Sequence, residues 1–195
     1  MSEKKGVLVV FSAPSGCGKD TILRELFKKD TENEFVLSRS MTTRQPRNEE
    51  RDGVDYYFVT RERFEELIAE DGFIEFAEYN GNYYGTPKKP VEEWLSGGKT
   101  VILEIEVQGA SKVRAARPDA AGIFILPPSL EELERRLRNR KTDSPETIAK
   151  RIALAPGEIA QSKYFDYCVV NDDIGTATDE VYTILKNIKE DKSNV

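Results

Sequence analysis

The residues best suited to chemistry lie in a glycine-rich segment that reads F-S-A-P-S-G-C-G-K-D-T over residues 11–21. An apolar run precedes this segment and a helical pattern follows it, which is the setting of a phosphate-binding P-loop. Gly16 and Gly18 allow backbone N–H groups to turn toward phosphate oxygens, and Lys19 adds a positive charge beside the start of the helix. We therefore predict that a phosphorylated ligand binds Ala13, Pro14, Ser15, Gly16, Cys17, Gly18, Lys19, Asp20 and Thr21.

The loop departs from the P-loop pattern G-x-x-x-x-G-K-[ST] at two positions, since the chain has Ala13 in place of glycine and Asp20 in place of serine or threonine. Ala13 is a mild departure if its φ angle is negative. Asp20 replaces a hydroxyl that normally contacts Mg²⁺, so two alternatives are open: Asp20 binds the metal itself, or Thr21 takes part. The competing interpretation is a strand–helix turn without a ligand, which the Gly-x-Gly-Lys spacing disfavours.

A second candidate phosphate site lies in the segment S-M-T-T-R-Q-P-R over residues 40–47. Pro46 biases the preceding residue toward an extended conformation and keeps the segment out of a helix. Arg44 and Arg47 then project two guanidinium forks from one loop, an arrangement that suits a single phosphate. The competing interpretation is a solvated basic loop, which is the commoner arrangement of two nearby arginines.

Acidic and basic side chains further along the chain suit metal binding and phosphoryl transfer. Glu104 and Glu106 end an apolar strand pattern, which is the position from which an acidic residue faces Mg²⁺ in nucleotide-binding folds. Arg136 and Arg140 are four residues apart and share one helix face, and Arg151 lies in the next helical pattern. Such arginines can stabilise a transferring phosphoryl group; the competing interpretation is a solvated helix face.

Apolar runs alternate with helical patterns, which predicts an α/β fold with a parallel core sheet and crossover helices. Pro156 and Gly157 predict a kink or break in the helix that contains them. The predicted core strands are Val7–Phe11, Phe35–Ser38, Thr100–Ile105, Gly122–Leu126 and Tyr167–Val170. The predicted helices are Thr21–Lys29, Arg61–Glu70, Pro87–Ser96, Gly109–Ala116, Leu130–Arg140, Pro145–Ser162 and Thr176–Lys189.

Residues 40–86 have a different pattern, which predicts a small mixed β/α insertion on the core. Val54–Val59 and Phe73–Tyr79 alternate like half-buried strands, and Asn80-Gly81 is a strong hairpin signal. An insertion and a lid on a P-loop core suit an enzyme that encloses two nucleotides away from water. We predict one domain with core segments at about 1–39, 87–128 and 164–195, the insertion at about 40–86 and a helical lid at about 129–163.

Composition narrows the class of protein further. The 195 residues carry a formal net charge of −6, which disfavours a general nucleic-acid binder because such proteins present a basic surface. The apolar runs are too short to span a membrane and no signal peptide is visible, so we expect a cytoplasmic protein. The chain has no histidine, which excludes histidine triads, and its two cysteines are too few for a zinc site or a disulfide framework.

Taken together, these segments resemble guanylate kinase over nearly the whole chain, from about Gly6 to Asn187. The resemblance rests on residues 40–47 together with G-V-D-Y-Y-F-V at 53–59, F-I-E-F at 73–76 and G-N-Y-Y-G-T at 81–86. It continues through L-E-I-E-V-Q-G at 103–109, P-P-S at 127–129 and V-N-D-D at 170–173. The resemblance implies a P-loop three-layer α/β fold with a GMP-binding insertion and a helical lid that closes over the phosphates.

The resemblance also implies roles for individual residues. Glu75, with a hydroxyl from Ser40 or Thr86, is expected to read guanine, because one carboxylate accepts both N1–H and N2–H of that base. ATP is expected on the P-loop with Asn171 near adenine. The implied GMP-binding residues are Ser40, Arg44, Arg47, Tyr56, Glu75, Tyr84, Thr86 and Glu104. The implied catalytic residues are Lys19, Arg44, Arg136, Arg140 and Arg151.

Three positions depart from the guanylate kinase pattern. Glu106 stands where the family usually has Asp, and Glu49 stands in a turn where the family often has Gly, so we expect that turn to adopt a negative φ angle. We interpret Asp20, the third departure, as altered metal handling in which its carboxylate supplies the oxygen of the missing hydroxyl. The predicted ligands of Mg²⁺ are therefore Asp20, Thr21 and Glu106.

These inferences predict an enzyme of purine nucleotide metabolism that uses Mg²⁺ to transfer the γ-phosphoryl group of ATP to GMP, and to dGMP as well, giving GDP and ADP. One alternative is a kinase for a phosphorylated sugar, which the G-K-D-T variant of the loop suits and the base-reading set disfavours. Another is a non-catalytic guanylate-kinase-like interaction module, which the retained Lys19 disfavours. We expect no nucleic-acid or membrane partner, and both a monomer and a homo-oligomer stay open.

Overall fold

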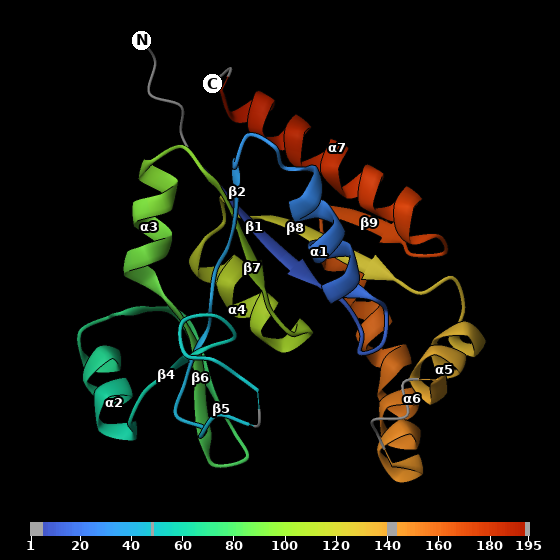
Figure 1. The fold of residues 1–195 in the computed structure, drawn as a ribbon, viewed down its shortest axis with the longest axis horizontal. Helices are drawn as coiled ribbons and strands as arrows, with labels where there is room; N and C mark the ends of the chain where they lie inside the picture. Colours follow the sequence, from blue (N-terminus) through green and yellow to red (C-terminus); the bar gives the residue numbers. More distant parts are fainter. Residues whose placement is uncertain (1–5, 48, 140–143, 194–195) are drawn as a thin grey trace.

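A parallel five-stranded sheet forms the core of the computed structural model, which describes residues 6–47, 49–139 and 144–193. The strand order is β2-β7-β1-β8-β9, and every neighbouring pair in this sheet is parallel (Figure 1). The predicted α/β fold with a parallel core sheet is therefore confirmed. The strands of this sheet are β1 Val7–Ser12, β2 Phe35–Leu37, β7 Thr100–Glu104, β8 Ala121–Leu126 and β9 Tyr167–Val170.

Both faces of the core sheet are buried under helices, as the continuous apolar sequence of its central strands predicts. Successive side chains of a strand point to opposite faces. Along β1, Val7 and Val9 pack into one apolar cluster, whereas Leu8 and Val10 pack into a second cluster on the other face. The helices over the first cluster include α1 Lys19–Lys29 and α7 Ile174–Ser193, and those over the second are α3 Lys88–Ser96 and α4 Val107–Ala116.

A second sheet, with the strand order β4-β3-β6-β5, forms a lobe below the core in Figure 1. The predicted hairpin is confirmed, because β5 and β6 are antiparallel and the φ angles of Asn80 and Gly81 are 49° and 75°. The ring of Phe64 stacks on those of Phe73 and Tyr83, with centroid distances of 4.2 and 5.1 Å, and so fastens α2 to this sheet. The elements of this small-sheet lobe are β3 Met41–Thr42, β4 Tyr57–Phe58, α2 Arg61–Ala69, β5 Phe73–Tyr79 and β6 Asn82–Pro87.

The strand predicted over Val54–Val59 is wrong for most of its length, since only two of its residues form β4. The Asp55 N–H donates to the carbonyl of Arg51 in a turn, and the Asp55 carboxylate accepts from the Arg51 N–H at 2.8 Å. Asp52 likewise accepts from the N–H of Phe58 at 2.8 Å. The N–H groups of Val54 and Asp55 therefore bond the Arg51 carbonyl of this turn and not a neighbouring strand.

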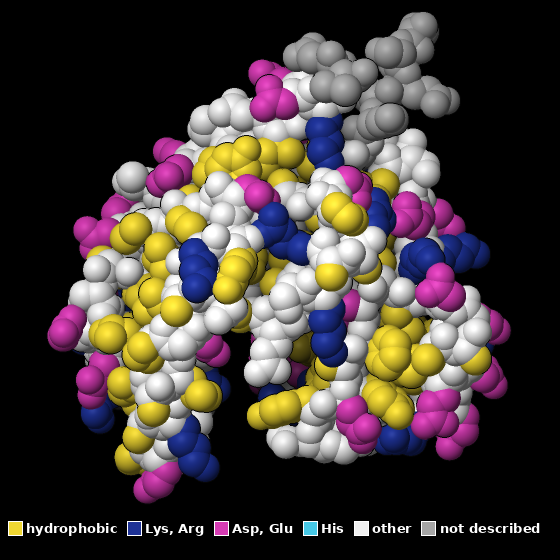
Figure 2. All heavy atoms as spheres, turned by 180° about the vertical axis from the view of Figure 1, so that it is seen from behind, with side chains coloured by type: hydrophobic (Ala, Val, Ile, Leu, Met, Phe, Trp, Pro, Cys, Tyr) yellow, Lys and Arg dark blue, Asp and Glu magenta, His cyan; other side chains and the backbone are white. Residues whose placement is uncertain are grey.

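Two helices form a second lobe, α5 Leu130–Asn139 and α6 Pro145–Ile159, and α6 leads into the 3₁₀ helix η1 Ala160–Tyr164. The predicted break at Pro156 does not occur. Helix α6 continues through this proline and ends at Ile159. Proline removes one backbone donor, and the buried side chains of Ile148 and Ala155 hold the helix against the core. Seen from behind, the molecule is hollowed between this lobe and the small-sheet lobe (Figure 2).

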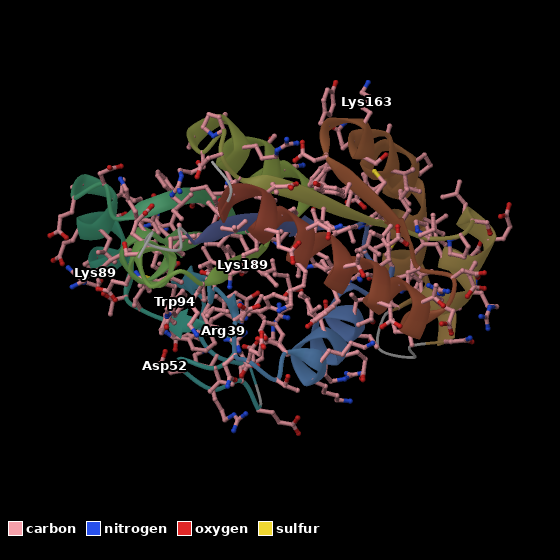
Figure 3. The ribbon with its side chains drawn as sticks, turned by 90° about the horizontal axis from the view of Figure 1, so that it is seen from above. Arg39, Asp52, Lys89, Trp94, Lys163 and Lys189 are labelled. Carbon is pink, nitrogen blue, oxygen red and sulfur yellow. The ribbon has the colours of Figure 1, made fainter. Side chains whose placement is uncertain are left out.

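Lys, Arg, Asp and Glu side chains are scattered over the face seen in Figure 2, among hydrophobic side chains. Lys163, labelled in Figure 3, projects into solvent from η1. Among residues 6–47, 49–139 and 144–193, no helix combines the length and the apolar character that crossing a membrane requires.

Glu34 fastens the chain just before β2 to α7. Its carboxylate accepts from Lys186 at 2.5 Å and from Lys189, which Figure 3 labels, at 2.7 Å. The hydrogen bond from Lys186, followed by that from Lys189, lowers the pKa of Glu34 from 4.5 to about 2. The carboxylate therefore stays ionised and paired well into the acid range, and it ties this strand to the C-terminal helix.

Replacing Glu34 with glutamine is expected to lower the free energy of unfolding at neutral pH and to flatten its decline in acid. The folded-state pKa of Glu34 is depressed, so its contribution is present in full above pH 4.5 and is lost as pH falls toward about 2. Urea unfolding at a series of pH values measures this decline. Glu65→Gln, which removes an exposed ion pair with Arg61, is the control, and equal acid slopes for wild type and Glu34→Gln would contradict the prediction.

Candidate active site

The glycine-rich segment forms a loop between β1 and α1, as the sequence predicts. Gly16 and Gly18 have φ angles of 93° and 81°, in the left-handed region that favours glycine. Helix α1 begins at Lys19, two residues before the predicted start, because the Gly18 carbonyl already accepts from the N–H of Thr21. Ala13 does not have a positive φ angle, so alanine fits the position where the P-loop pattern has glycine. The backbone of the loop is therefore built to curve around an anion.

Glu104 holds Lys19 at the carboxyl end of the central strands. β1 and β7 pair in parallel with Phe11 opposite Glu104, so the loop and the end of β7 lie side by side. The Lys19 ammonium donates to Glu104 Oε1 at 2.6 Å, and the two side chains are 19% and 29% exposed. The structure thus gives Glu104 the P-loop lysine as its partner, while its contact with GMP stays a prediction.

A buried amide supports the loop from the end of β9. Asn171 donates from Nδ2 to the carbonyl of Cys17 at 2.7 Å, and a Cβ atom at Gly18 would stand only 2.5 Å from the same nitrogen. Burial raises the pKa of the Cys17 thiol to about 12, so this thiol stays protonated and is no nucleophile. The sequence did not indicate the supporting role of Asn171, and its contact with adenine stays a prediction.

Arginines from α5 and α6, the two helices of the second lobe, reach the loop and its surroundings. Arg136 on α5 donates to Glu132 at 2.7 Å and to the backbone carbonyl of Asn171 at 2.8 Å. Arg151 on α6 donates to the hydroxyl of Ser15 at 2.5 Å. The structure therefore brings two predicted catalytic arginines from different helices to the edge of the P-loop.

Glu158 on α6 is a further acid beside the loop that the sequence did not single out. Burial raises the pKa of Glu158, an effect that a hydrogen bond from the Ser15 N–H opposes and the nearby charge of Glu106 reinforces. This coupling shows that α6, the P-loop and the start of α4 converge at one place. Arg140, predicted at the end of α5, lies outside the described residues.

The predicted metal ligands lie at the starts of two helices. Asp20 is exposed in the first turn of α1 beside the partly buried Thr21, and Glu106 is exposed at the N-cap of α4. Within the part of the chain that the structure describes, no three His, Cys, Asp or Glu side chains form a group able to hold a metal ion. Mg²⁺ at nucleotide sites is bound by one or two carboxylates together with phosphate oxygens and water. These oxygen donors therefore fit Mg²⁺ that arrives with a nucleotide.

A half-buried carboxylate pairs with a buried hydroxyl on the small sheet. Glu75 in β5 lies opposite Thr86 in β6, and the Thr86 hydroxyl donates to Glu75 Oε1 at 2.9 Å. Burial raises the pKa of Glu75, and the Thr86 hydrogen bond partly opposes this shift. Ser40 directly precedes β3, which pairs with β6 on the side opposite to β5, so the three predicted guanine-reading residues lie on or beside neighbouring strands. An acceptor and hydroxyl donors therefore lie together on this sheet.

Arg44 projects from the loop after β3 and is held by a carboxylate that the sequence did not single out. Its guanidinium nitrogens donate to the two oxygens of Glu50, both at 2.9 Å. The Tyr56 ring centroid lies 5.5 Å from the guanidinium carbon, and the Tyr84 ring packs edge-on against Tyr56 at a centroid distance of 6.3 Å. Three predicted phosphate-binding side chains thus meet in one place, while the fourth, Arg47, is exposed.

The family model for guanylate kinase matches residues 5–188 of the 195-residue chain. The chain belongs to the guanylate kinase family. The guanylate kinase of Streptococcus pneumoniae (strain ATCC BAA-255 / R6) is 53% identical over 182 residues, which cover 93% of this chain and 87% of that protein. The guanylate kinase of Carboxydothermus hydrogenoformans is 50% identical over 181 residues, which cover 93% and 88% of the two chains.

Solved structures agree with this membership of the guanylate kinase family. The crystal structure of guanylate kinase from Anaplasma phagocytophilum matches with a TM-score of 0.75 at 37% identity, over 97% of this chain and 89% of that chain. A shikimate kinase from Bacteroides thetaiotaomicron, with a TM-score of 0.50 at 16% identity over 92% of this chain and 98% of that chain, shares the fold alone. The resemblance to guanylate kinase that the motifs indicate is therefore confirmed.

One departure from the guanylate kinase pattern strains the backbone. Glu49 has a φ angle of 81°, so the expected negative φ angle is wrong. The turn around it is closed by the Glu50 N–H, which donates to the Arg47 carbonyl at 3.0 Å. In this left-handed region the Cβ atom of a non-glycine residue crowds its own backbone, at a cost of roughly 1–2 kcal/mol.

Replacing Glu49 with glycine is expected to give a protein about 1 kcal/mol more stable than the Glu49→Ala variant, even though glycine gains more freedom on unfolding. Both changes remove the carboxylate, but only glycine removes the Cβ atom that strains the turn. Urea denaturation of the two variants measures the difference in the free energy of unfolding. Equal free energies of unfolding for Glu49→Gly and Glu49→Ala would contradict the prediction, because the Cβ atom would then not strain the turn.

Proposed function

We propose that the protein transfers the γ-phosphoryl group of ATP to GMP, giving ADP and GDP. The observation that carries this proposal is the Glu75–Thr86 pair on the sheet whose adjoining loop carries Arg44. A hydrogen-bonding set for a base and a guanidinium for a phosphate lie on one lobe, while the P-loop lies on the core. Membership of the guanylate kinase family supports the same assignment.

Guanine is the base that suits Glu75. Guanine presents N1–H and N2–H on one edge, and one carboxylate accepts both, while Ser40 or a rotated Thr86 hydroxyl donates to O6. Adenine has an unprotonated N1 on that edge, which would face the carboxylate acceptor to acceptor. Leaving such a buried polar group unpaired costs about 1–3 kcal/mol, enough to separate the two bases.

Catalysis in this proposal consists of positioning and charge neutralisation. The phosphate of GMP is already anionic at neutral pH, so its in-line attack on the γ-phosphorus needs no strong general base. Lys19 exchanges Glu104 for phosphate oxygens, and the arginines neutralise charge in the loose transition state. The side chains proposed to contact phosphate groups are Lys19, Arg44, Arg47, Tyr56, Tyr84, Arg136, Arg140 and Arg151.

We further propose Mg²⁺ as the cofactor that arrives with ATP, held by Asp20 or Thr21 and by Glu106. When bound, the ion neutralises part of the negative charge of the phosphates. The GMP contacts assigned above involve the base and the phosphate, so dGMP, which lacks only the 2′-hydroxyl, is proposed as a second acceptor. With these substrates we propose a role in purine nucleotide metabolism and a cytoplasmic location.

Replacing Glu75 with glutamine is expected to raise KM for GMP by about 10- to 100-fold and to leave KM for ATP nearly unchanged. A coupled assay of ADP release with GMP, dGMP and AMP as acceptors measures both constants. In the wild type, GMP affinity is expected to fall in acid, because burial raises the pKa of Glu75 and the protonated carboxyl accepts less well. The Glu75→Gln variant is expected to lack this pH dependence.

Glu78→Gln is the matched control for Glu75→Gln, since Glu78 lies on the same strand but is 48% exposed and faces Arg61 at the surface. Equal turnover of AMP and GMP by the wild type would contradict the guanine-reading role of Glu75. Absence of turnover with any acceptor would contradict the proposed activity and favour a non-catalytic interaction module.

Replacing Asp20 with serine is expected to raise the Mg²⁺ concentration for half-maximal activity by about three- to tenfold, because a hydroxyl is a weaker ligand than a carboxylate. Titration of Mg²⁺ at fixed ATP and GMP concentrations measures the shift. Glu25→Gln, in the same helix and paired with Lys28, is the control. An unchanged Mg²⁺ dependence would contradict a role of Asp20 in holding the metal.

A further inference from the structure

Arg44, the residue proposed to receive the acceptor phosphate, already has protein partners in this structure. Both terminal nitrogens of its guanidinium donate to the Glu50 carboxylate, at 2.9 Å each, and Nη1 also donates to the carbonyl of Gln45 at 2.8 Å. The side chains of Arg44 and Glu50 are 15% and 22% exposed. A bidentate fork of this kind fixes the plane and the direction of a guanidinium as well as its distance.

The same carboxylate also fixes the backbone of the loop. Glu50 Oε2 accepts from the N–H of Arg47 at 2.8 Å, and the turn between these residues contains Glu49 in its left-handed conformation. A strained residue persists where its surroundings over-determine it, and such residues are frequent at ligand clamps. The strained turn therefore places the Glu50 carboxylate against the segment that carries both predicted phosphate-binding arginines.

Aromatic side chains lie beside the Arg44 guanidinium. The ring centroids of Tyr56 and Phe58 lie 5.5 and 5.8 Å from its carbon, and the Tyr84 ring packs edge-on against Tyr56 at a centroid distance of 6.3 Å. The hydrogen bond with Glu50 is the largest cause of a raised Arg44 pKa, and the same bond lowers the pKa of Glu50 to about 2. Guanidinium and carboxylate therefore both stay charged throughout the neutral range.

We propose that Glu50 is a positioning residue for the phosphoryl acceptor, one that holds the Arg44 guanidinium and the Arg47 backbone in the orientation that receives the phosphate of GMP. This inference rests on the proposed roles of Arg44 and Arg47. Glu50 has two opposing effects on GMP, because its charge repels the phosphate while its hydrogen bonds preorganise Arg44. The bidentate pairing cancels most of the repulsion and leaves the preorganisation intact, so the second effect prevails.

Replacing Glu50 with glutamine tests this proposal, since glutamine keeps the shape of the side chain but loses its charge and one acceptor oxygen. We expect KM for GMP to rise about tenfold, with KM for ATP unchanged within about twofold. Equilibrium titration with GMP in the absence of ATP is expected to show the same loss of affinity. Unchanged or tighter GMP binding would overturn the proposal, because only the repulsive charge would then matter.

A double-mutant cycle shows whether Glu50 acts through Arg44. Arg44→Lys keeps the positive charge but lacks the fork. If Glu50 positions Arg44, adding Glu50→Gln to Arg44→Lys changes KM for GMP by less than about twofold, and full additivity would overturn the proposal. Unchanged GMP binding in Arg44→Lys alone would instead refute the proposed phosphate site on which the inference rests.

Glu65→Gln is the matched control for Glu50→Gln, because it breaks an arginine–glutamate pair in the same lobe whose members are 45% and 51% exposed. We expect this control to leave both KM values unchanged. Urea midpoints check that each variant is folded. If Glu50→Gln does not fold, Glu50→Asp takes its place; it keeps the charge but withdraws the carboxylate by one methylene, and the same rise in KM for GMP is expected.

Discussion

The ion pair between Lys19 and Glu104 joins the phosphate loop to the central sheet, and the rest of the site is arranged around this junction. Parallel pairing of β1 with β7 places both residues at the carboxyl edge of the sheet, where α/β folds bind their ligands. Other cations of the site are likewise held by oxygens of the protein. These oxygens therefore keep the cations from standing as unpaired, partly buried charges. The pairs are Lys19–Glu104, Arg44–Glu50 and Arg151–Ser15.

Structure that is determined by residues close together in the sequence is correctly predicted from the sequence. Gly16, Gly18 and Gly81 occupy left-handed positions that glycine adopts without strain. A short sequence segment is therefore enough to predict the loop and the hairpin. The continuous apolar runs likewise predict a sheet buried on both faces. Arg44 and Arg47 are recognisable as a pair because Pro46 keeps their segment extended.

Contacts between distant or competing groups are the parts that sequence patterns miss. The alternation at Val54–Val59 predicts a strand, but the N–H groups of Val54 and Asp55 donate to the Arg51 carbonyl in a turn. A glutamate rarely adopts a positive φ angle, so the glycine that the family often has at this position is the one sign that Glu49 is left-handed. The sequence around Glu50 is equally consistent with a solvated turn. Only the fold shows that the Arg44 guanidinium bonds the Glu50 carboxylate.

The hydrogen bond from Asn171 to Cys17 has a consequence for how the protein is made, because it joins residues 154 positions apart in the chain. Cys17 leaves the ribosome early, whereas Asn171 follows the last strand of the sheet. Contacts of such high sequence separation form late, since a long stretch of chain must be ordered before they close. The glycine-rich loop therefore acquires its full support only after β9 has been made, and a chain truncated before β9 would carry the loop sequence without the amide that braces it.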